Sequence, residues 1–278
     1  MSAIRPPVVQ RLLFRARMDP TFRLRLLAPA LPMDDAELGE PPPSPSELAL
    51  IRTTPEADLS ADPGGRSKAQ FLTNLASEFQ ASLASNPVVL EFLGDFCSSP
   101  EFHQAVAREE YLVLALGQHL ESRALRSGDR ELAAIIQLEK ALAWARRHPA
   151  SSQDPGPGEA VRSPQVHRIS LPAGTLARAE NLKGSPADLS AQRDSSKTDV
   201  SSELEAILVL RRPGTAFAPR PLHVERLEPL VATLLDFLET PRDLSARAEF
   251  ATEHDAKPAE LEAFLDGLVA DGVVRRGR

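Results

Sequence analysis

The chain has 278 residues, a mass of 30.2 kDa and a net charge of −7 at pH 7. Its 42% apolar and 26% charged residues exclude a wholly disordered chain. The single cysteine excludes internal disulfides and sites built from several cysteines. No apolar run is long enough to cross a membrane, and the mildly acidic balance gives no reason to expect nucleic acid. We predict a soluble, cytoplasmic protein.

Prolines divide the chain into regions. Eleven of the 25 prolines lie in residues 1–65, two in 66–148, nine in 149–221 and three in 222–278. Because a proline inside a helix costs about 3 kcal/mol, the stretch with two prolines is where long helices can form. Apolar residues recur there at helical spacing, so we predict that residues 66–148 form an all-helical module.

Residues 1–65 are predicted to form a Pro-rich arm with short helices. The apolar pattern over 7–28 predicts two short helices interrupted at Met18-Asp19-Pro20, and PPPSPS at 41–46 predicts an extended spacer. After the helical module, composition predicts a linker over 149–165 and a polar loop at 184–202.

The last region, 166–278, has a different pattern. Short alternating or β-branched runs predict strands. Three helices are predicted after them: one with the apolar stripe Leu227, Leu230, Val231, Leu234, Leu235 and Leu238, a short one at 244–253, and a last one with Leu261, Phe264, Leu265 and Leu268 that ends at Gly272. The expected strands lie at 167–171, 206–210, 222–224 and 273–275. Strands followed by three helices and a terminal strand are typical of a winged-helix domain. The predicted fold class is therefore α+β, with an N-terminal all-helical module and a C-terminal winged-helix domain that contains a small antiparallel sheet.

The sequence carries no recognised catalytic pattern. It has no GxGxxG, GxxxxGK[ST], HExxH or GxSxG motif. Its six histidines lack i, i+3 or i, i+4 pairing with one another, and no Glu-x-x-His of the kind used in di-iron helical bundles occurs. We therefore predict no catalytic residue, no bound metal and no cofactor, and a protein that is not an enzyme.

One group of residues comes nearest to an acid–base or metal cluster. Glu109 and Glu110 are predicted on one helix with His103 and His119. His103 and Glu110 would lie two turns apart, too far to share one metal. Solvated or salt-bridged side chains are one interpretation and a functional role is the other. Cys97 lies in an apolar stripe with no adjacent basic residue, which indicates a buried, inert thiol.

The predicted recognition helix is acidic. Residues 257–271 contain one Lys against four carboxylates, a net charge of −3. Because phosphate contacts need Lys or Arg, this charge disfavours DNA reading. A small sheet with an exposed edge can instead accept an extended peptide as an extra strand. A DNA-binding transcriptional regulator and a domain that only packs on its neighbour are the alternatives.

The N-terminal segment is basic. Five arginines lie among leucines and phenylalanines between residues 11 and 27, where Asp19 is the only acid. This segment either docks on an acidic partner surface or packs on the chain's own core. The residues assigned to partner binding are Arg11, Arg15, Arg23 and Arg25.

Two stretches carry a family resemblance. AILVLRRPGTAFAPRPLHVERLEPLVATLLDFLETPRDLSARAEF (206–250) and KPAELEAFLDGLVADGVV (257–274) resemble the PqqD-like recognition elements that hold leader peptides of ribosomally made, modified peptides. The shared features are a strand pair, the turn Leu-x-x-Pro-Arg-x-Leu and a last helix ending in Gly-Val-Val. MDPTFRLRLLAPA (18–30), QLEKALAWARR (137–147) and HRISLPAGTLARAEN (167–181) resemble partner subunits of multinuclear non-haem iron oxidative enzymes, of the methanobactin-biosynthesis type.

The resemblance implies a non-catalytic subunit. Such a protein binds the leader of a precursor peptide and presents the core to an iron enzyme, which holds the metal. The leader would pair with the strand around residues 216–224 and lie against the last helix. The residues that the resemblance assigns to peptide binding are Ala216, Phe217, Leu222, Val224, Leu261, Phe264 and Leu268.

Overall fold

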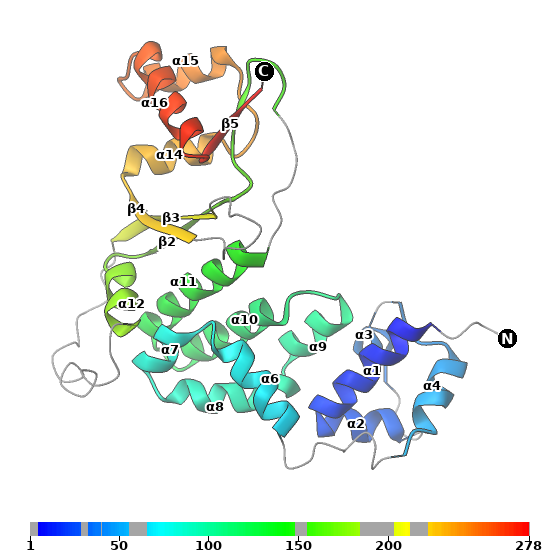
Figure 1. Ribbon diagram of the computed structural model, residues 1–278. Helices are drawn as coiled ribbons and strands as arrows, with labels where there is room; N and C mark the ends of the chain where they lie inside the picture. The colour runs from blue at the N-terminus through cyan, green and yellow to red at the C-terminus, as the bar shows by residue number, and fades with distance from the viewer. Residues whose placement is uncertain are drawn as a thin grey trace, which may run out of the picture. The chain divides into compact units, whose positions relative to one another are not determined.

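The computed structural model describes residues 5–28, 33–39, 41–55, 66–147, 155–183, 203–211 and 222–277. It combines helices with small antiparallel sheets, which confirms the α+β class. The chain divides into two compact units (Figure 1). The helical unit is Met1–Lys140 with Ala179–Lys197, and the sheet unit is Ala141–Arg178 with Thr198–Arg278.

The helical unit contains no strand among its described residues. Its helices are α1 (Pro6–Met18), α2 (Pro20–Leu27), α3 (Asp35–Leu38), α4 (Pro45–Arg52), α6 (Arg66–Ala76), α7 (Gln80–Ser85), α8 (Val88–Asp95), the 3-10 helix η2 (Phe96–Ser98), α9 (Pro100–Ala107), α10 (Leu112–Arg126) and the first part of α11 (Arg130–Arg147).

Local chemistry fixes the ends of the first helices. Asp19 separates α1 from α2, and its side chain accepts a hydrogen bond from the backbone N–H of Thr21 at 2.8 Å. Pro20 follows at the first helical position, so the predicted break is confirmed. The predicted spacer 41–46 is wrong at its end, because Ser44 and Glu47 form a capping box and α4 begins at Pro45.

A distant carboxylate caps another helix. No side chain at the start of α7 caps it locally. Instead the buried Glu139 of α11 accepts hydrogen bonds from the backbone N–H groups of Ala81 and Ser82 and from the Ser82 hydroxyl, at 2.7, 3.0 and 2.6 Å. Three donors compensate the burial of the charge, which ties α11 to α7.

The sheet unit contains all five strands of the described residues. They are β1 (Ala160–Arg162), β2 (Val166–Pro172), β3 (Leu204–Arg211), β4 (Leu222–Leu227) and β5 (Val274–Arg276). β2, β3 and β4 form an antiparallel sheet in that order, and β1 pairs antiparallel with β5. The helices are α14 (Pro229–Phe237), α15 (Leu244–Glu253) and α16 (Pro258–Ala270), and the unit also holds the end of α11 and the start of α12 (Thr175–Lys183).

Both faces of the three-stranded sheet are covered (Figure 1). Leu208 and Leu210 of β3 pack in a core with α14, α15 and α16. Val209, which points the other way, packs against Ala141, Leu142 and Ala145 of α11. The central strand is therefore apolar at successive positions, as a strand buried on both sides requires.

The strand predictions of the last region are confirmed, with two additions. The expected strands at 167–171, 206–210, 222–224 and 273–275 correspond to β2, β3, β4 and β5. β1 lies inside the predicted linker, and α12 was not predicted. The three residues of β1 carry no strand pattern of their own and form a strand by pairing with β5 at the far end of the chain. The predicted polar loop at 184–202 lies outside the described residues.

Candidate peptide-binding site

The three-stranded sheet β2-β3-β4 of the sheet unit has an open edge at β4. Among the described residues, β4 pairs with β3 alone, in the register Val209 to Val224 and Leu210 to His223. The backbone groups on the other side of an edge strand can pair with an added strand. Glu225 and Arg226 of β4 are exposed, so side chains there are reachable from solvent.

The two faces of β4 differ. Leu222 and Val224 are partly buried and pack on the face covered by the end of α11. Leu227 points to the opposite face and belongs to the core formed with α14, α15 and α16. A strand added beside β4 would likewise direct alternate side chains to the two faces.

An apolar pocket of about 190 Å³ lies among the three helices of the sheet unit. Its lining residues are Leu230, Val231 and Leu234 of α14, Phe250, Ala251 and His254 of α15, Ala256, and Leu261 and Phe264 of α16. Two of these residues are large apolar side chains left in solvent, Leu230 at 49% and Phe264 at 44% exposure. An apolar hollow whose rim is also apolar suits an apolar side chain from another molecule.

The pocket is close to β4 along the chain. Leu227 ends β4, Glu228 occupies the N-cap position of the next helix, and α14 begins at Pro229. Leu230 on the rim is therefore three residues after the last residue of the open-edged strand. The sheet edge and the pocket are positioned by one continuous strand–helix connection.

The predicted peptide-binding residues fall into three groups. Leu261 and Phe264 line the pocket, whereas Leu268 packs on the core of the sheet unit. Leu222 and Val224 lie on β4 with their side chains on the other face of the sheet. Ala216 and Phe217 lie outside the described residues. The structure thus brings Leu261 and Phe264 together and places Leu222 and Val224 apart from them.

Sequence reasoning missed the α14 and α15 part of the pocket. Leu230, Val231 and Leu234 are predicted only as part of the apolar stripe of a helix, and Phe250 and His254 are not singled out. The available signal is the width of the apolar stripe on α14. Leu234, Leu235 and Leu238 are buried in the core, whereas Leu230 belongs to the same stripe and is exposed. A surplus apolar residue at the edge of a stripe is where a binding surface can be sought.

Acidic side chains of α16 form ion pairs with arginines of the sheet unit. Glu262 lies 2.8 Å from the buried Arg247 and 2.9 Å from Arg276, and Asp266 lies 2.6 Å from Arg276. Arg247 also donates to the carbonyls of Gly158 and Arg242, so these charges hold α15 and α16 to the segment before β1. The helix 258–270 contains no Lys or Arg for phosphate contacts.

Two of the four arginines assigned to partner binding lie inside the helical unit. Arg11 is 9% exposed and donates to the carbonyls of Ala107 and Pro41 at 3.3 and 2.9 Å. Arg15 is 2% exposed and donates from Nε to Nδ1 of His103 at 2.9 Å. Arg23 and Arg25 are half-buried on α2. For Arg11 and Arg15, packing on the chain's own core is the role that the contacts support.

The Glu/His cluster expected on one helix is not on one helix. α9 ends at Ala107 and α10 begins at Leu112, and Glu109 between them has a positive φ of 55°. The buried His119 has Nε2 3.0 Å from the Phe92 carbonyl and Nδ1 3.4 Å from Glu101. In the part of the chain that the structure describes, no group of three His, Cys, Asp or Glu residues could hold a metal ion.

Cys97 is buried, as predicted. It is free, fully buried in η2, and burial raises the pKa of its thiol to about 11. A thiol with such a pKa is protonated at neutral pH and is a poor nucleophile.

In comparisons with known proteins, no family model matches this chain and no curated protein matches its sequence. Among the described residues, no helix is both long enough and apolar enough to cross a membrane.

Proposed function

We propose that this chain is a non-catalytic, cytoplasmic partner subunit that binds the leader of a ribosomally made precursor peptide and presents the peptide to an iron-dependent oxidative enzyme. The observation that carries the proposal is the open edge of β4 followed directly by an apolar pocket. The order of three antiparallel strands and three helices supports it, because the PqqD-like elements that the sequence resembles have a winged-helix order.

The proposed binding mode adds the leader as a fourth strand beside β4. Main-chain hydrogen bonds would supply affinity, and alternate side chains would supply specificity. One set of leader side chains would face Leu222 and Val224, and the other set would face the side of α14 and α16. An apolar leader residue would enter the pocket between Leu230 and Phe264.

The helical unit is the proposed contact with the enzyme. Among the four arginines predicted to bind a partner, Arg23 and Arg25 of α2 are more accessible than Arg11 and Arg15, and they suit an acidic surface on the enzyme. The iron would belong to the enzyme subunit. Co-expression of the two chains is expected to give a stable complex.

The test of leader binding starts from the genome, where the proposal expects a short open reading frame beside the gene for this chain. The encoded peptide is synthesised with a fluorophore and titrated with the full chain in a fluorescence anisotropy assay. Saturable binding of its N-terminal half is expected. A gene neighbourhood without such a frame, absence of saturable binding, or preferential binding of duplex DNA would contradict the proposal.

Two proline variants test pairing at the β4 edge. Successive N–H groups of a strand point to opposite sides, so of Val224→Pro and Glu225→Pro one removes an N–H from the ladder with β3 and the other removes an N–H from the open edge. The variant that loses the N–H of the open edge keeps the ladder with β3 and should therefore lose less thermal stability. This variant is expected to bind the leader at least about tenfold more weakly than the unaltered chain. Unchanged affinity in that variant would remove the edge from the binding mode.

A matched pair of variants tests the pocket. Phe264→Ala removes a half-exposed ring from the rim, and Leu244→Ala removes a 60% exposed side chain of the same unit that does not line the pocket. Phe264→Ala is expected to weaken leader binding and Leu244→Ala to leave it unchanged, with both proteins folded. Equal affinities of the two variants would count against the pocket.

A further inference from the structure

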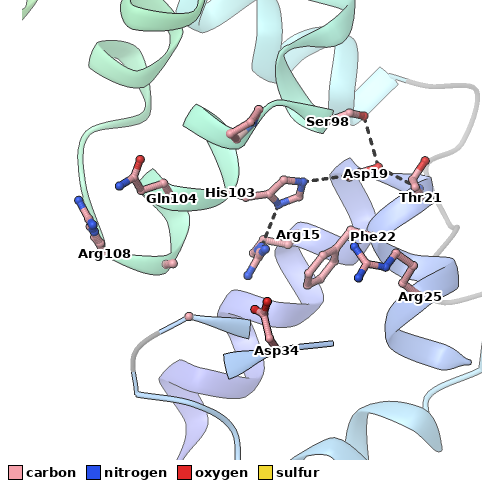
Figure 2. Close-up of a pocket in the computed structure, with 13 residues that line it drawn as sticks. Arg15, Asp19, Thr21, Phe22, Arg25, Asp34, Ser98, His103, Gln104 and Arg108 are labelled. Carbon is pink, nitrogen blue, oxygen red and sulfur yellow. Dashed lines mark hydrogen bonds and ion pairs between the residues drawn. The ribbon is translucent and has the colours of Figure 1, made fainter. Parts of the chain in front are cut away.

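The described residues form a pocket in each unit, and the two pockets differ in how their charged groups are used. The larger one, of about 700 Å³, lies in the helical unit between α2, α9 and the segment around α3 (Figure 2). There Arg15 donates to His103 at 2.9 Å, Nε2 of His103 lies 2.8 Å from Asp19, and Arg108 lies 3.8 Å from Glu110. Burial alone would raise the pKa of Asp19, but the hydrogen bonds from His103 and the α2 backbone outweigh burial and lower it. These charges are engaged within the helical unit.

The smaller pocket, in the sheet unit, has the size of a site for one side chain. Its volume of about 190 Å³ is below the range of about 300–1,000 Å³ that is typical of small-molecule sites. Phe250, Ala251 and Leu261 are buried in its walls, and the exposed Leu230 and Phe264 stand at its rim. Its size and lining therefore favour an apolar side chain of a polypeptide over a whole small molecule.

The segment that forms this pocket carries the negative charge of the chain. Residues 228–271 contain eleven carboxylates against three Lys or Arg, a net charge of −8, whereas the whole chain has −7. Two of the three basic residues already pair with carboxylates of α16, Lys257 with Glu260 at 2.9 Å and Arg247 with Glu262 at 2.8 Å. The surplus charge around the pocket is therefore negative.

Three exposed carboxylates beside the pocket are unpaired. Glu253 and Asp255 flank the lining residue His254 in the chain, and Glu228 is two residues before Leu230. In the part of the chain that the structure describes, the side chains of these three residues form no ion pair or hydrogen bond. Because consecutive Cα atoms are about 3.8 Å apart, the three charges lie within about one Debye length, roughly 8 Å at physiological salt, of a lining residue. They can attract a cation bound beside the pocket.

The end of α15 fixes the position of Asp255. This residue has a positive φ of 53°, and the following N–H, of Ala256, donates to the carbonyl of Ala251 at 2.8 Å. Ala251 and Ala256 both line the pocket, so the backbone on either side of Asp255 belongs to the pocket wall. Asn tolerates the same φ, so Asp255→Asn removes the charge without a new backbone strain.

We propose that the pocket of the sheet unit selects a basic amphipathic peptide, in which the apolar side chain that enters the pocket has Lys or Arg beside it. The apolar side chain is buried between Leu230 and Phe264, and the flanking cations lie near Glu228, Glu253 and Asp255. The inference rests on the proposed function for the source of the peptide, which would be a leader with this pattern. Charge complementarity favours such a segment over an acidic one.

Three terminally blocked, fluorescein-labelled peptides of equal length test the inference by fluorescence anisotropy with the full chain. The first has a central leucine between lysines, the second a central leucine between glutamates, and the third a central serine between lysines. The first is expected to bind saturably at low salt, at least about tenfold more tightly than either of the others. High salt is expected to weaken its binding.

The outcomes separate this inference from the proposed function. Equal affinities of the two leucine peptides would overturn the charge selection and leave the apolar pocket of the proposed function intact. Equal affinities of the two lysine peptides, or no binding of the first peptide, would overturn the inference even if the leader binds. Binding of the first peptide by a chain that fails to bind the leader would support the inference and contradict the proposed function.

Two double variants assign the charge effect to the pocket. Glu253→Gln with Asp255→Asn is expected to raise the Kd of the first peptide about threefold or more at low salt. Glu91→Gln with Glu180→Gln makes the same change in net charge at exposed carboxylates of the helical unit and is expected to leave the Kd unchanged. Equal affinities of the two folded double variants would overturn the inference.

Sedimentation velocity tests the other occupant of an apolar pocket, a second copy of this chain. The oligomeric state is expected to be the same with and without the first peptide. Dimerisation that the peptide reverses and that Phe264→Ala abolishes would assign the pocket to a second copy and overturn the inference.

Discussion

The two units of this chain are stabilised in different ways. In the helical unit, buried charged side chains satisfy helix ends and one another, as Glu47 does with Arg5 and Glu139 with α7. In the sheet unit, a three-stranded sheet is packed on both faces by apolar side chains. Both units have an apolar core, and Arg247 is a buried charge in the sheet unit as well. The difference is that buried carboxylates of the helical unit bond to helix starts, whereas the sheet unit leaves the edge of a strand open.

The chain contains one natural reporter for each unit. Cys97, its single cysteine, is buried in the helical unit and reacts with thiol reagents only when that unit opens. Trp144, its single tryptophan, stacks on His167 in the sheet unit with ring centres 4.6 Å apart. Thiol labelling and tryptophan fluorescence can therefore separate the unfolding of the two units.

The largest expected effect is in the apolar core of the sheet unit. Leu265 is fully buried in α16, and Leu265→Ala is expected to destabilise this unit by about 2–5 kcal/mol, because it removes contacts and leaves a cavity. Trp144 fluorescence is expected to report unfolding at lower denaturant while Cys97 labelling is unchanged. Phe264→Ala, at the neighbouring exposed position, is the control and should cost less than about 1 kcal/mol. Equal losses would show that the pocket rim is part of the core.

The corresponding change in the helical unit removes a buried charge. Glu139→Ala leaves the Ala81 and Ser82 N–H groups at the start of α7 without an acceptor, and we expect a loss of about 2–4 kcal/mol. Cys97 labelling should accelerate strongly. Glu91→Ala, which removes an exposed carboxylate of α8, should change the labelling rate little. A similar rate for both variants would mean that the cap does not contribute to stability.

Sequence alone predicted those parts of the fold whose signals are local. The break at Asp19-Pro20 and strands β2 and β3 were found because capping residues and β-branched runs mark them within a few positions. β1 and the Glu139 cap could not be found in this way, because each depends on a partner far along the chain. Nothing in the residues around Ala160 or Glu139 identifies those partners.

The candidate site was predictable to a similar degree. Leu261 and Phe264 were predicted to bind a peptide, and both line one pocket, while their binding role stays a prediction. The α14 and α15 walls were missed because helical periodicity shows which face of a helix is apolar and not how deeply each residue is covered. The hydrogen bond from Arg15 to His103 was missed for the same reason as β1, since α1 and α9, which carry these residues, are far apart in the sequence.

Acid is expected to affect the helical unit first. The hydrogen bonds from Arg5 hold the pKa of the Glu47 carboxyl well below its usual range, and the pKa of Asp19 is also lowered. Because these pKa values are lower in the folded than in the unfolded protein, their stabilising effect is present above the unfolded values near pH 4 and is lost as the pH falls further. Thermal unfolding followed by far-UV circular dichroism is expected to show a lower melting temperature for this unit at pH 3 than at pH 6.

Glu47→Gln is the variant that checks the cause of this acid sensitivity. It removes the titrating carboxyl, so its melting temperature should fall less between pH 6 and pH 3 than that of the unaltered chain, even though it starts lower. Trp144 fluorescence should show a smaller acid effect on the sheet unit. An identical fall in both proteins would assign the acid sensitivity to other groups.

The smallest expected effects compare one helix cap from each unit. Asp243 accepts a hydrogen bond from the Ala246 N–H at 2.8 Å, whereas Ser44 accepts one from the Glu47 N–H at 3.3 Å. Asp243→Ala is expected to cost about 1 kcal/mol and Ser44→Ala about half of that. Ser44 belongs to a complete capping box, but the second bond of that box, from the Ser44 N–H to Glu47 at 2.7 Å, uses the backbone and persists in the alanine variant. Trp144 fluorescence measures the first loss and Cys97 labelling the second. A larger loss for Ser44→Ala would show that the side chain, rather than the backbone N–H, holds Glu47 in place.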